Sequence, residues 1–361
     1  MRQIKKILFS ALLFLLFSAK TVFGADGLEV HFIDVGQADA ALVISDGHAM
    51  MIDGGSDSDS QLIYSYLKKQ KIEYLDYIIA SHSDADHVGG LSGAVSYAGS
   101  NIGTVFAPYT KSSKERFQTF QRKLAENGKL ITVPKVGDSY PLGSATFRIL
   151  SAAGEEDKAN LTLRLQYGKH SFLFTGDADS DLEKQMISTG LNIESTVLKV
   201  GHHGSKSSTS YQFLREVDPS YAVIPVGKGN SYGHPTDDVL SRLRDQGATV
   251  YRTDNNGTII FTSDGKNLSV KSEKTYSQEQ NLIASEMISN SSTAGTAITR
   301  SAAINSNAGT STYVLNTNTK KFHRPGCSSV NKMKEKNKKI VEDTRDHIIS
   351  QGYDPCKNCS P

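Results

Sequence analysis

The segment from His82 to His87 constrains the fold of this chain most, because it concentrates four side chains that can bind a metal ion. It reads His-Ser-Asp-Ala-Asp-His and follows a short apolar run, Tyr77–Ala80, that has the composition of a buried strand. In an extended loop alternate side chains point the same way, so His82, Asp84 and Asp86 share one side and His87 turns toward it. The segment therefore predicts a metal site at the end of a strand. The alternative is a polar loop whose Asp86 caps a following helix.

Three later segments end in side chains of the same kind. Phe172–Asp177 is an apolar strand that ends in Gly and a carboxylate, and Val197–Gly204 is a strand that ends in His202 and His203. The turn Gly229–Pro235 adds His234. Because strand ends meet at one edge of an α/β fold, these side chains are expected to converge with the His82–His87 segment on one metal site.

The region from Leu28 to about Lys271 alternates strand-like and helix-like stretches, which is typical of a layered α/β domain. Helices are expected at Gln61–Lys69, Lys114–Asn127 and Asp237–Gln246. The domain organisation that we predict is a signal peptide at 1–24, this domain at 25–272, a flexible linker at 273–311 and a small tail domain at 312–361.

Several motifs in one order resemble the metallo-β-lactamase domain of ComEC-type competence proteins over about Leu28 to Thr262. They are Asp34–Asp39, Ile52–Gly55, His82–His87, Thr175–Asp177 and Gly201–Ser205. The resemblance implies a four-layer αββα sandwich with a two-metal site between its sheets. It also implies a metal-dependent hydrolase, most consistent with a phosphodiesterase or nuclease that acts on DNA.

The resemblance implies two ligand sets that share Asp177. One metal would be held by His82, Asp84 and Asp177, and the other by Asp86, His87, Asp177 and His202. Relative to the wider superfamily, Asp84 and Asn160 stand where histidines are expected, so the first position is weaker and richer in oxygen. Such a site suits Mn²⁺ as well as Zn²⁺.

Three side chains are candidate catalytic groups. Asp86 would orient the attacking water, and His203 or His234 would protonate the leaving group or contact the phosphate. The alternatives are a histidine that only supports the ligands for His203 and a turn histidine beside Pro235 for His234.

Two other functions remain open for the same fold. One is a lactonase or β-lactamase-like hydrolase, because fold alone does not set the substrate. The other is a non-catalytic DNA-binding module that assists DNA uptake. The net charge of +2 gives no whole-protein argument for a nucleic-acid partner, so such an argument must come from local patches.

The N-terminus has the pattern of a signal peptide. Arg2, Lys5 and Lys6 precede the apolar run Ile7–Ala19, and a plausible cleavage point lies before Ala25. We therefore expect a secreted or extracytoplasmic protein at the bacterial cell surface, with no stable membrane insertion after cleavage. The alternative is an uncleaved anchor, for which the apolar run is short.

The tail contains a Cys₃His pattern that predicts one structural zinc, with the ligands His323, Cys327, Cys356 and Cys359. It resembles the Ada-like zinc-binding tail of some secreted bacterial nucleases. The alternative is a Cys356–Cys359 disulfide. A lysine-rich stretch from Lys332 to Lys339 predicts contact with a DNA backbone, or else is a solvated helix face.

Overall fold

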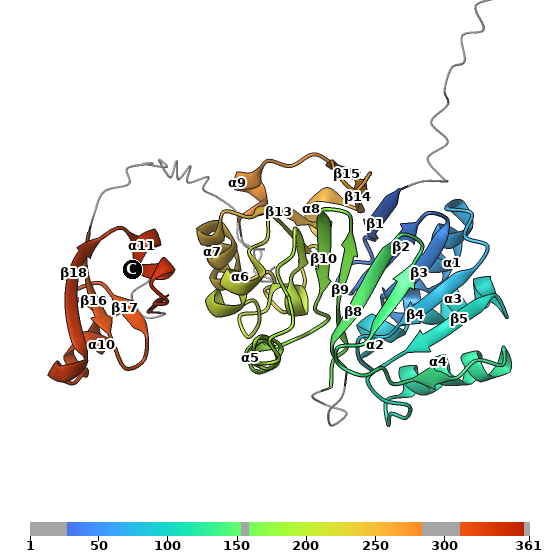
Figure 1. Cartoon of the computed structure of the whole chain (residues 1–361), viewed down its shortest axis with the longest axis horizontal. Helices are drawn as coiled ribbons and strands as arrows, with labels where there is room; N and C mark the ends of the chain where they lie inside the picture. Colours follow the sequence, from blue (N-terminus) through green and yellow to red (C-terminus); the bar gives the residue numbers. More distant parts are fainter. Residues whose placement is uncertain (1–26, 153–158, 284–310, 357–361) are drawn as a thin grey trace, which may run out of the picture.

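The computed structural model describes residues 27–152, 159–283 and 311–356 (Figure 1). The predicted signal peptide, most of the predicted linker and Cys359 lie outside these ranges. Within them, no helix has the length and apolar character needed to cross a membrane.

Two β-sheets face each other in the large domain. The first has eight strands in the order β15-β14-β1-β2-β3-β4-β5-β6. Their bounds are β1 Leu28–Phe32, β2 Ala40–Ser45, β3 His48–Gly54, β4 Leu75–Ile79, β5 Ile102–Phe106, β6 Ile131–Thr132, β14 Ile259–Ser263 and β15 Leu268–Ser272.

The second sheet has seven strands in the order β13-β12-β11-β10-β9-β8-β7. Their bounds are β7 Ser139–Leu142, β8 Ala145–Ser151, β9 Thr162–Tyr167, β10 His170–Phe174, β11 Val197–Lys199, β12 Tyr221–Ile224 and β13 Thr249–Arg252. β10, β11, β12 and β13 run parallel, so their carboxyl ends meet at one edge.

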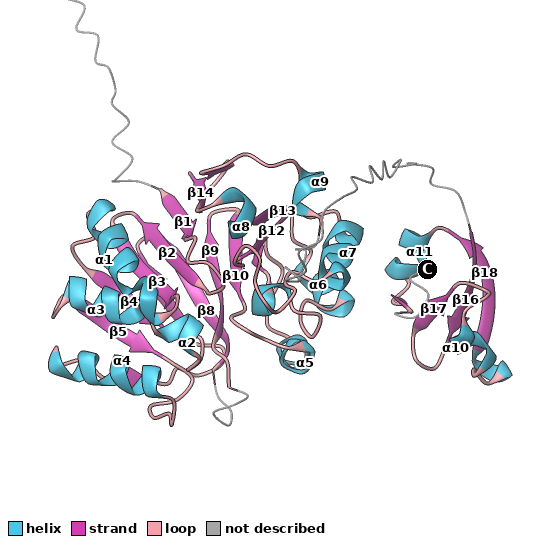
Figure 2. Cartoon of the chain, turned by 180° about the vertical axis from the view of Figure 1, so that it is seen from behind, coloured by secondary structure: helices cyan, strands magenta, loops and turns pink. Residues whose placement is uncertain are grey.

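Helices cover the outer face of each sheet (Figures 1 and 2). The first is covered by α1 Ser60–Lys69, α3 Leu91–Ala98 and α4 Glu115–Glu126, and the second by α5 Ser180–Ser188, α6 Tyr211–Val217 and α7 Asp237–Gln246. The shorter helices are α2 Ala85–Val88, α8 Thr253–Asn256 and α9 Gln278–Asn281. The helices predicted from the sequence at residues 61–69, 114–127 and 237–246 are confirmed within a residue.

The layers are held together by three apolar cores that follow the two-residue period of the strands. On β10, Phe172 and Phe174 point into the core between the sheets, and Leu173 points into the core beneath α5, α6 and α7. On β4, Ile79 and Ile78 divide in the same way between the inner core and the helices α1, α3 and α4. This arrangement confirms the predicted four-layer αββα sandwich.

The large domain continues past the end predicted from its composition. The sequence placed a linker from residue 273, but α9 lies against β13. The Gln278 side chain binds both the amide and the carbonyl of Val250, at 2.6 and 3.0 Å, and Asn281 donates to the same carbonyl. Polar side chains that satisfy a strand edge give no apolar signal in the sequence, which explains the difference.

The tail is a small four-stranded sheet in the order β18-β16-β17-β19. Its elements are β16 Ser311–Asn316, β17 Lys321–His323, α10 Ser328–Asn331, β18 Lys338–Asp343, α11 Arg345–Ser350 and β19 Asp354–Pro355. Its lysine-rich stretch, Lys332 to Lys339, is not one helix, because it begins directly after α10 and then passes through a short 3₁₀ turn into the start of β18.

Phe261 on β14 is a test of the inner core, because its ring is fully buried and contacts the rings of Phe32, Phe172, Tyr221 and Tyr251. Phe261→Ala is expected to lower the free energy of unfolding by about 3–5 kcal/mol, because it leaves a cavity between the sheets. Urea unfolding followed by circular dichroism measures this. Leu130→Ala is the control, since Leu130 is 81% exposed and its loss is expected to have almost no effect. Equal effects of the two changes would contradict this account of the core.

Candidate metal centre

The candidate site lies where strands of both sheets end. β4 runs into the loop that carries His82 and then into α2, which carries Asp86 and His87. From the second sheet, β10 leads to Asp177, and β11 leads to the short turn Gly201–Gly204. Three of the four segments singled out in the sequence thus meet at one edge of the sandwich, and the fourth, Gly229–Pro235, places His234 beside His202.

Five side chains form the centre of this site. His87 Nε2 lies 3.2 Å from Asp177 Oδ1, and His203 Nε2 lies 3.3 Å from Asp86 Oδ2. His82 Nε2 and His203 Nε2 lie 3.9 and 4.0 Å from the Asp177 carboxylate. Two ligand atoms on one tetrahedral zinc ion lie about 3.3 Å apart, so the shortest of these spacings match a shared metal.

The polar atoms at this centre are buried and unsatisfied. His82 Nε2, His87 Nε2, His203 Nε2 and Asp177 Oδ1 have no hydrogen-bond partner among the described residues. Buried polar atoms are almost always paired, so a group of them pointing at one space calls for a missing partner. Imidazole nitrogens and carboxylate oxygens are ligands for Zn²⁺ and Mn²⁺, so the donor set fits divalent cations.

The ligand atoms fall into two overlapping groups. One group is His82, His87 and Asp177, and the other is Asp86, His87 and His203, with the ligand atoms of each group within 4.8 Å of one another. The grouping agrees with two adjacent metal positions.

Asp53 holds His87 in place. Its carboxylate accepts hydrogen bonds from the Ser81 amide at 2.8 Å, from the Ser81 hydroxyl at 2.7 Å and from His87 Nδ1 at 2.9 Å. A bond to Nδ1 fixes the ring so that Nε2 faces the site. Asp53 therefore orients a ligand rather than facing the site itself.

Asp39 and Lys199 form a buried ion pair behind His203. Asp39 Oδ1 lies 3.3 Å from His203 Nδ1, which also donates to the carbonyl of Pro225 at 3.0 Å. Lys199 donates to the carbonyl of Gly176, the residue before Asp177, at 3.0 Å. The pair therefore links the loops that carry His203 and Asp177.

The charges of these groups depend on one another. Burial alone would raise the pKa of the Asp177 carboxyl, but His87, His203 and His82 hold it well below its ordinary value. Burial lowers the pKa of His203, yet Asp39 and Asp86 together raise it to about 10. The histidines thus favour the ionised form of Asp177, and the neighbouring carboxylates favour the protonated form of His203.

Asp84 and Asn160, which the sequence analysis placed at the first metal position, make contacts of their own. Asp84 is 46% exposed and pairs with the ammonium of Lys114, while its other oxygen lies 3.7 Å from His82 Nε2. Asn160 points to the backbone: it accepts from the Asp177 amide at 3.0 Å and donates to the Thr175 carbonyl at 2.7 Å. Asn160 therefore shapes the turn that carries Asp177.

The structure places His203, rather than His202, inside the cluster. His203 is 3% exposed, whereas His202 is 42% exposed and its Nε2 lies 3.6 Å from Asp177 Oδ2. Both residues adopt left-handed backbone conformations, with φ of 50° for His202 and 53° for His203. This turn buries the ring of His203 and leaves that of His202 exposed. Strained backbone of this kind persists where the surrounding structure fixes it.

His234 is buried beside the more exposed His202, with the two rings 5.8 Å apart. Burial and the nearby His202 and His203 lower the pKa of His234 to about 4, so it is neutral. Beside it, Tyr232 is 70% exposed, and its ring lies nearly parallel to that of His234 at 5.8 Å. Asn230 fixes this loop by accepting from the amides of Tyr232 and His234, both at 3.1 Å.

A second cluster lies in the tail. His323, Cys327 and Cys356 are buried with their ligand atoms within 4.8 Å of one another. The two sulfurs are 3.9 Å apart, close to the spacing of about 3.8 Å for two thiolates on one tetrahedral zinc. His323 Nδ1 is buried and has no hydrogen-bond partner in the described part of the chain. Three of the four predicted ligands thus converge, and the fourth, Cys359, lies outside the described residues.

Sequence reasoning missed Asp39, Lys199 and Lys114 as members of the site. Asp39 stood in a quoted motif without a role. Lys199 carried a usable signal, because it is a charged residue within the apolar strand Val197–Val200. Lys114 comes from a distant loop at the start of α4, and only the fold brings it to Asp84. Asp34 orders its own turn through the Gly36 amide.

Comparison with known proteins agrees with this geometry. Residues 33–228 match the family model described as the metallo-beta-lactamase superfamily. ComE operon protein 3 of Bacillus subtilis is 30% identical over 255 residues, covering 64% of this chain and 33% of that protein. Recombination protein 2 of Haemophilus influenzae is 32% identical over 240 residues, covering 64% and 28%. Competence protein ComA of Neisseria gonorrhoeae is 30% identical over 234 residues, covering 63% and 31%.

These relatives confirm the predicted resemblance to ComEC-type competence proteins. The chain spans about a third of their length. Among solved structures, the metallo-beta-lactamase fold protein YhfI of Bacillus subtilis aligns with a TM-score of 0.47 at 15% identity, over 66% of this chain and all of that protein.

Asp177→Ala is expected to remove most bound metal, because Asp177 lies between the two groups of ligands. Inductively coupled plasma mass spectrometry on protein loaded with Mn²⁺ or Zn²⁺ measures the metal content, and the zinc expected in the tail would provide an internal reference. Asp181→Ala, which changes an exposed aspartate four residues away, is the control and should leave the metal content unchanged. Full metal content in Asp177→Ala would show that Asp177 is not a shared ligand.

The two metal positions are expected to differ in affinity, because Asp84 and Asn160 replace imidazoles and Lys114 competes for Asp84. A chelator titration should remove one equivalent before the other, and Asp84→His should narrow the gap. Equal affinities in the unchanged protein would contradict the asymmetry.

Proposed function

The chain belongs to the metallo-β-lactamase superfamily, and from this premise we propose that it is a secreted two-metal phosphodiesterase that hydrolyses DNA. The observation that carries the proposal is the convergence of the unsatisfied atoms of His82, His87, His203 and Asp177. These atoms need cations, and the superfamily uses cations at this edge of the sandwich for hydrolysis.

We assign the ligands as follows. The first metal position uses His82, Asp177 and Asp84, and the second uses Asp86, His87, His203 and Asp177. His203 takes the place that the sequence gave to His202, because its buried Nε2 faces Asp86 and its Nδ1 is fixed by Asp39 and Pro225. His202 remains at the rim, where it can contact substrate.

The residues of this chain have distinct tasks in hydrolysis. Two divalent ions, when bound by these ligands, would supply the Lewis-acid chemistry for phosphodiester hydrolysis. The Asp86 side chain is 38% exposed and can orient the attacking water. His202 and the neutral His234 line the rim on the Tyr232 side, where each can donate a hydrogen bond to a phosphate oxygen or to the leaving group.

Three features support DNA as the substrate. The relatives are named as competence and recombination proteins. The first metal position is rich in carboxylate oxygen, which suits Mn²⁺ as well as Zn²⁺. Tyr232 presents an exposed aromatic ring beside the site, and such rings stack on nucleobases.

The tail would bind one structural zinc through His323, Cys327, Cys356 and Cys359. A unit of this size has a small apolar core, so a metal would contribute much of its stability. The expected signal peptide places the protein outside the cytoplasm, at the cell surface or beyond it.

The direct test is to incubate the mature protein with labelled DNA, a small phosphodiester and a lactone, each with Zn²⁺, Mn²⁺ or Mg²⁺. We expect cleavage of DNA and of the small phosphodiester, and loss of both activities in Asp177→Ala. Turnover of the lactone alone would favour the lactonase alternative. Tight DNA binding without turnover in any metal would favour the non-catalytic uptake module.

Tyr232→Ala is expected to weaken binding of a single-stranded oligonucleotide by about 1–3 kcal/mol, because one stacked base is lost. Tyr232→Phe should keep most of the affinity, since the aromatic face remains. Fluorescence anisotropy measures this. Tyr74→Ala, at an exposed tyrosine just before β4, is the control, because it lies at the opposite end of that strand from His82. An unchanged affinity in Tyr232→Ala would remove this tyrosine from the substrate site.

A further inference from the structure

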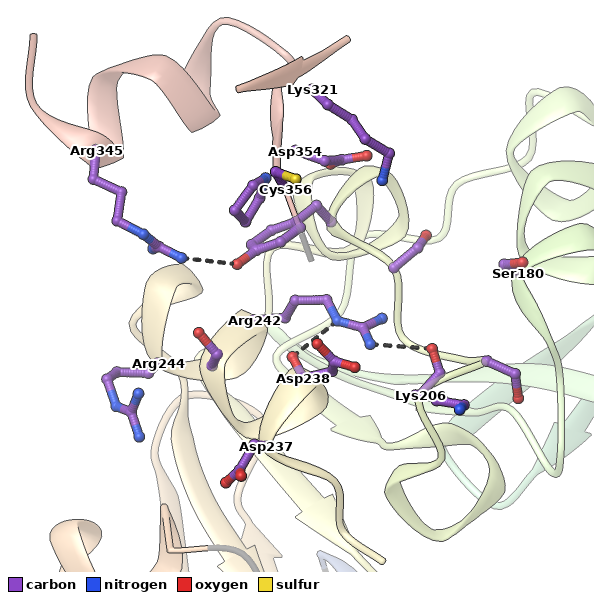
Figure 3. Close-up of a pocket in the computed structure, with 15 residues that line it drawn as sticks. Ser180, Lys206, Asp237, Asp238, Arg242, Arg244, Lys321, Arg345, Asp354 and Cys356 are labelled. Atoms are coloured by element: carbon purple, nitrogen blue, oxygen red, sulfur yellow. Dashed lines mark hydrogen bonds between the residues drawn. The ribbon is translucent and has the colours of Figure 1, made fainter. Parts of the chain in front are cut away.

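The tail contacts the large domain through a specific set of side chains (Figure 3). Arg345 at the start of α11 forms an ion pair with Asp245 near the end of α7. The Tyr211 hydroxyl, at the start of α6, donates to Asp245, and Arg345 Nη2 donates to the Tyr211 oxygen at 3.4 Å. Three charged or polar groups from the two parts thus form one network.

This network is shielded from water. The side chain of Asp245 is 11% exposed and that of Arg345 is 26% exposed. The Tyr211 ring packs against the apolar core of the tail, formed by Tyr313, Leu315, Phe322, Ile348, Ile349 and Tyr353. A partly buried ion pair joined to aromatic packing is stronger than an exposed ion pair, so this contact can hold the tail against the domain.

A cleft of about 540 Å³ lies at this junction and is lined from both sides. Arg242, Arg244 and Lys206 line it from the large domain, and Lys321 and Arg345 line it from the tail. The Arg244 guanidinium turns outward and donates to the Leu282 carbonyl at 3.2 Å. Besides these five basic residues, of which Arg345 is already paired with Asp245, the lining contains the three acidic residues Asp237, Asp238 and Asp354. The Arg242 guanidinium is held by the carbonyls of Lys206, Ser208 and Thr209, which fixes its charge in place.

The cleft is built on the loops that also carry the metal ligands. Ser180 in its lining follows Asp177 by three residues, and Lys206 follows His203 by three residues. The cleft and the metal centre therefore share two backbone segments, and a polyanion bound in the cleft would lie beside those segments.

We propose that the tail docks on the large domain through Tyr211, Asp245 and Arg345, and that the cleft between them binds the phosphate backbone of a nucleic acid strand. The inference rests on the proposed function, since it assigns to the same enzyme a binding site for the part of the strand that is not being cut. A small phosphodiester bound at the metal centre would not reach the cleft, whereas a long strand would occupy both the metal centre and the cleft.

Lys206 and Lys321 test the cleft, because they contribute charge from its two sides. In an Asp177→Ala background, which prevents cleavage, Lys206→Gln combined with Lys321→Gln is expected to weaken binding of a 30-nucleotide strand about tenfold. The slope of log affinity against log salt should become shallower by about 1–2, because fewer phosphates are neutralised. Lys69→Gln combined with Lys266→Gln removes two exposed lysines elsewhere and is the matched control. Equal affinity and slope in the two double variants would overturn the cleft assignment.

Charge reversal at Asp245 tests docking, because docking and overall charge predict opposite results. Asp245→Arg adds positive charge and would strengthen DNA binding if only net charge mattered. Docking predicts weaker binding, since Arg345 would be repelled and the cleft would open. Combining Asp245→Arg with Arg345→Asp should restore much of the affinity, and a circular dichroism spectrum of Asp245→Arg like that of the unchanged protein shows that the single variant is folded. Stronger binding in Asp245→Arg, or no recovery in the combined variant, would overturn the docking.

Hydrolysis of a small phosphodiester by the unchanged protein separates this inference from the proposed function. If that hydrolysis is absent, the proposed function fails, while the binding measurements still decide the cleft. If it is present and the lysine variants bind as the controls do, only the cleft assignment fails.

Discussion

Four carboxylates that meet at the edge between the two sheets, those of Asp39, Asp53, Asp86 and Asp177, impose the main constraint on this molecule. Lys199 is the one lysine paired with them among the described residues. Ionised carboxylates without matching positive charge are costly to bury. His82, His87 and His203 face the same space with unsatisfied nitrogens, so divalent cations would satisfy both the carboxylates and the imidazoles. The two facing sheets hold these groups together at one edge of the sandwich.

Much of the local backbone follows from this requirement. Asp53, His202 and His203 adopt left-handed conformations that are uncommon for residues other than glycine. Each lies directly before or within a loop of the site, and each is held by bonds to neighbouring strands or loops. The apolar cores on either side of both sheets provide the stability that allows this strain. In the tail, too, a small apolar core positions the candidate ligands His323, Cys327 and Cys356.

The sequence predicted the sandwich and the loops of the site because the motifs mark strand ends, and strand ends meet at an edge. It did not predict which of His202 and His203 points inward, because this depends on two successive left-handed residues between Gly201 and Gly204. It did not predict the pairing of Asp84 with Lys114, which are 30 residues apart and meet only in the folded domain. It also ended the large domain at 272, because the contacts of Gln278 and Asn281 with β13 are polar and leave no periodic signal. Docking of the tail depends on Tyr211, Asp245 and Arg345, and nothing in the spacing of these residues marks them as partners.

The account depends most on the claim that the carboxylate and imidazole cluster holds metal ions. Crystals of the protein grown with Mn²⁺ and measured at the manganese and zinc absorption edges test this directly. The account predicts two anomalous peaks within coordination distance of Asp177, one beside His82 and one beside His203, and a separate zinc peak between Cys327 and Cys356. An ordered site without any anomalous peak near Asp177, in crystals that contain the tail zinc, would contradict it.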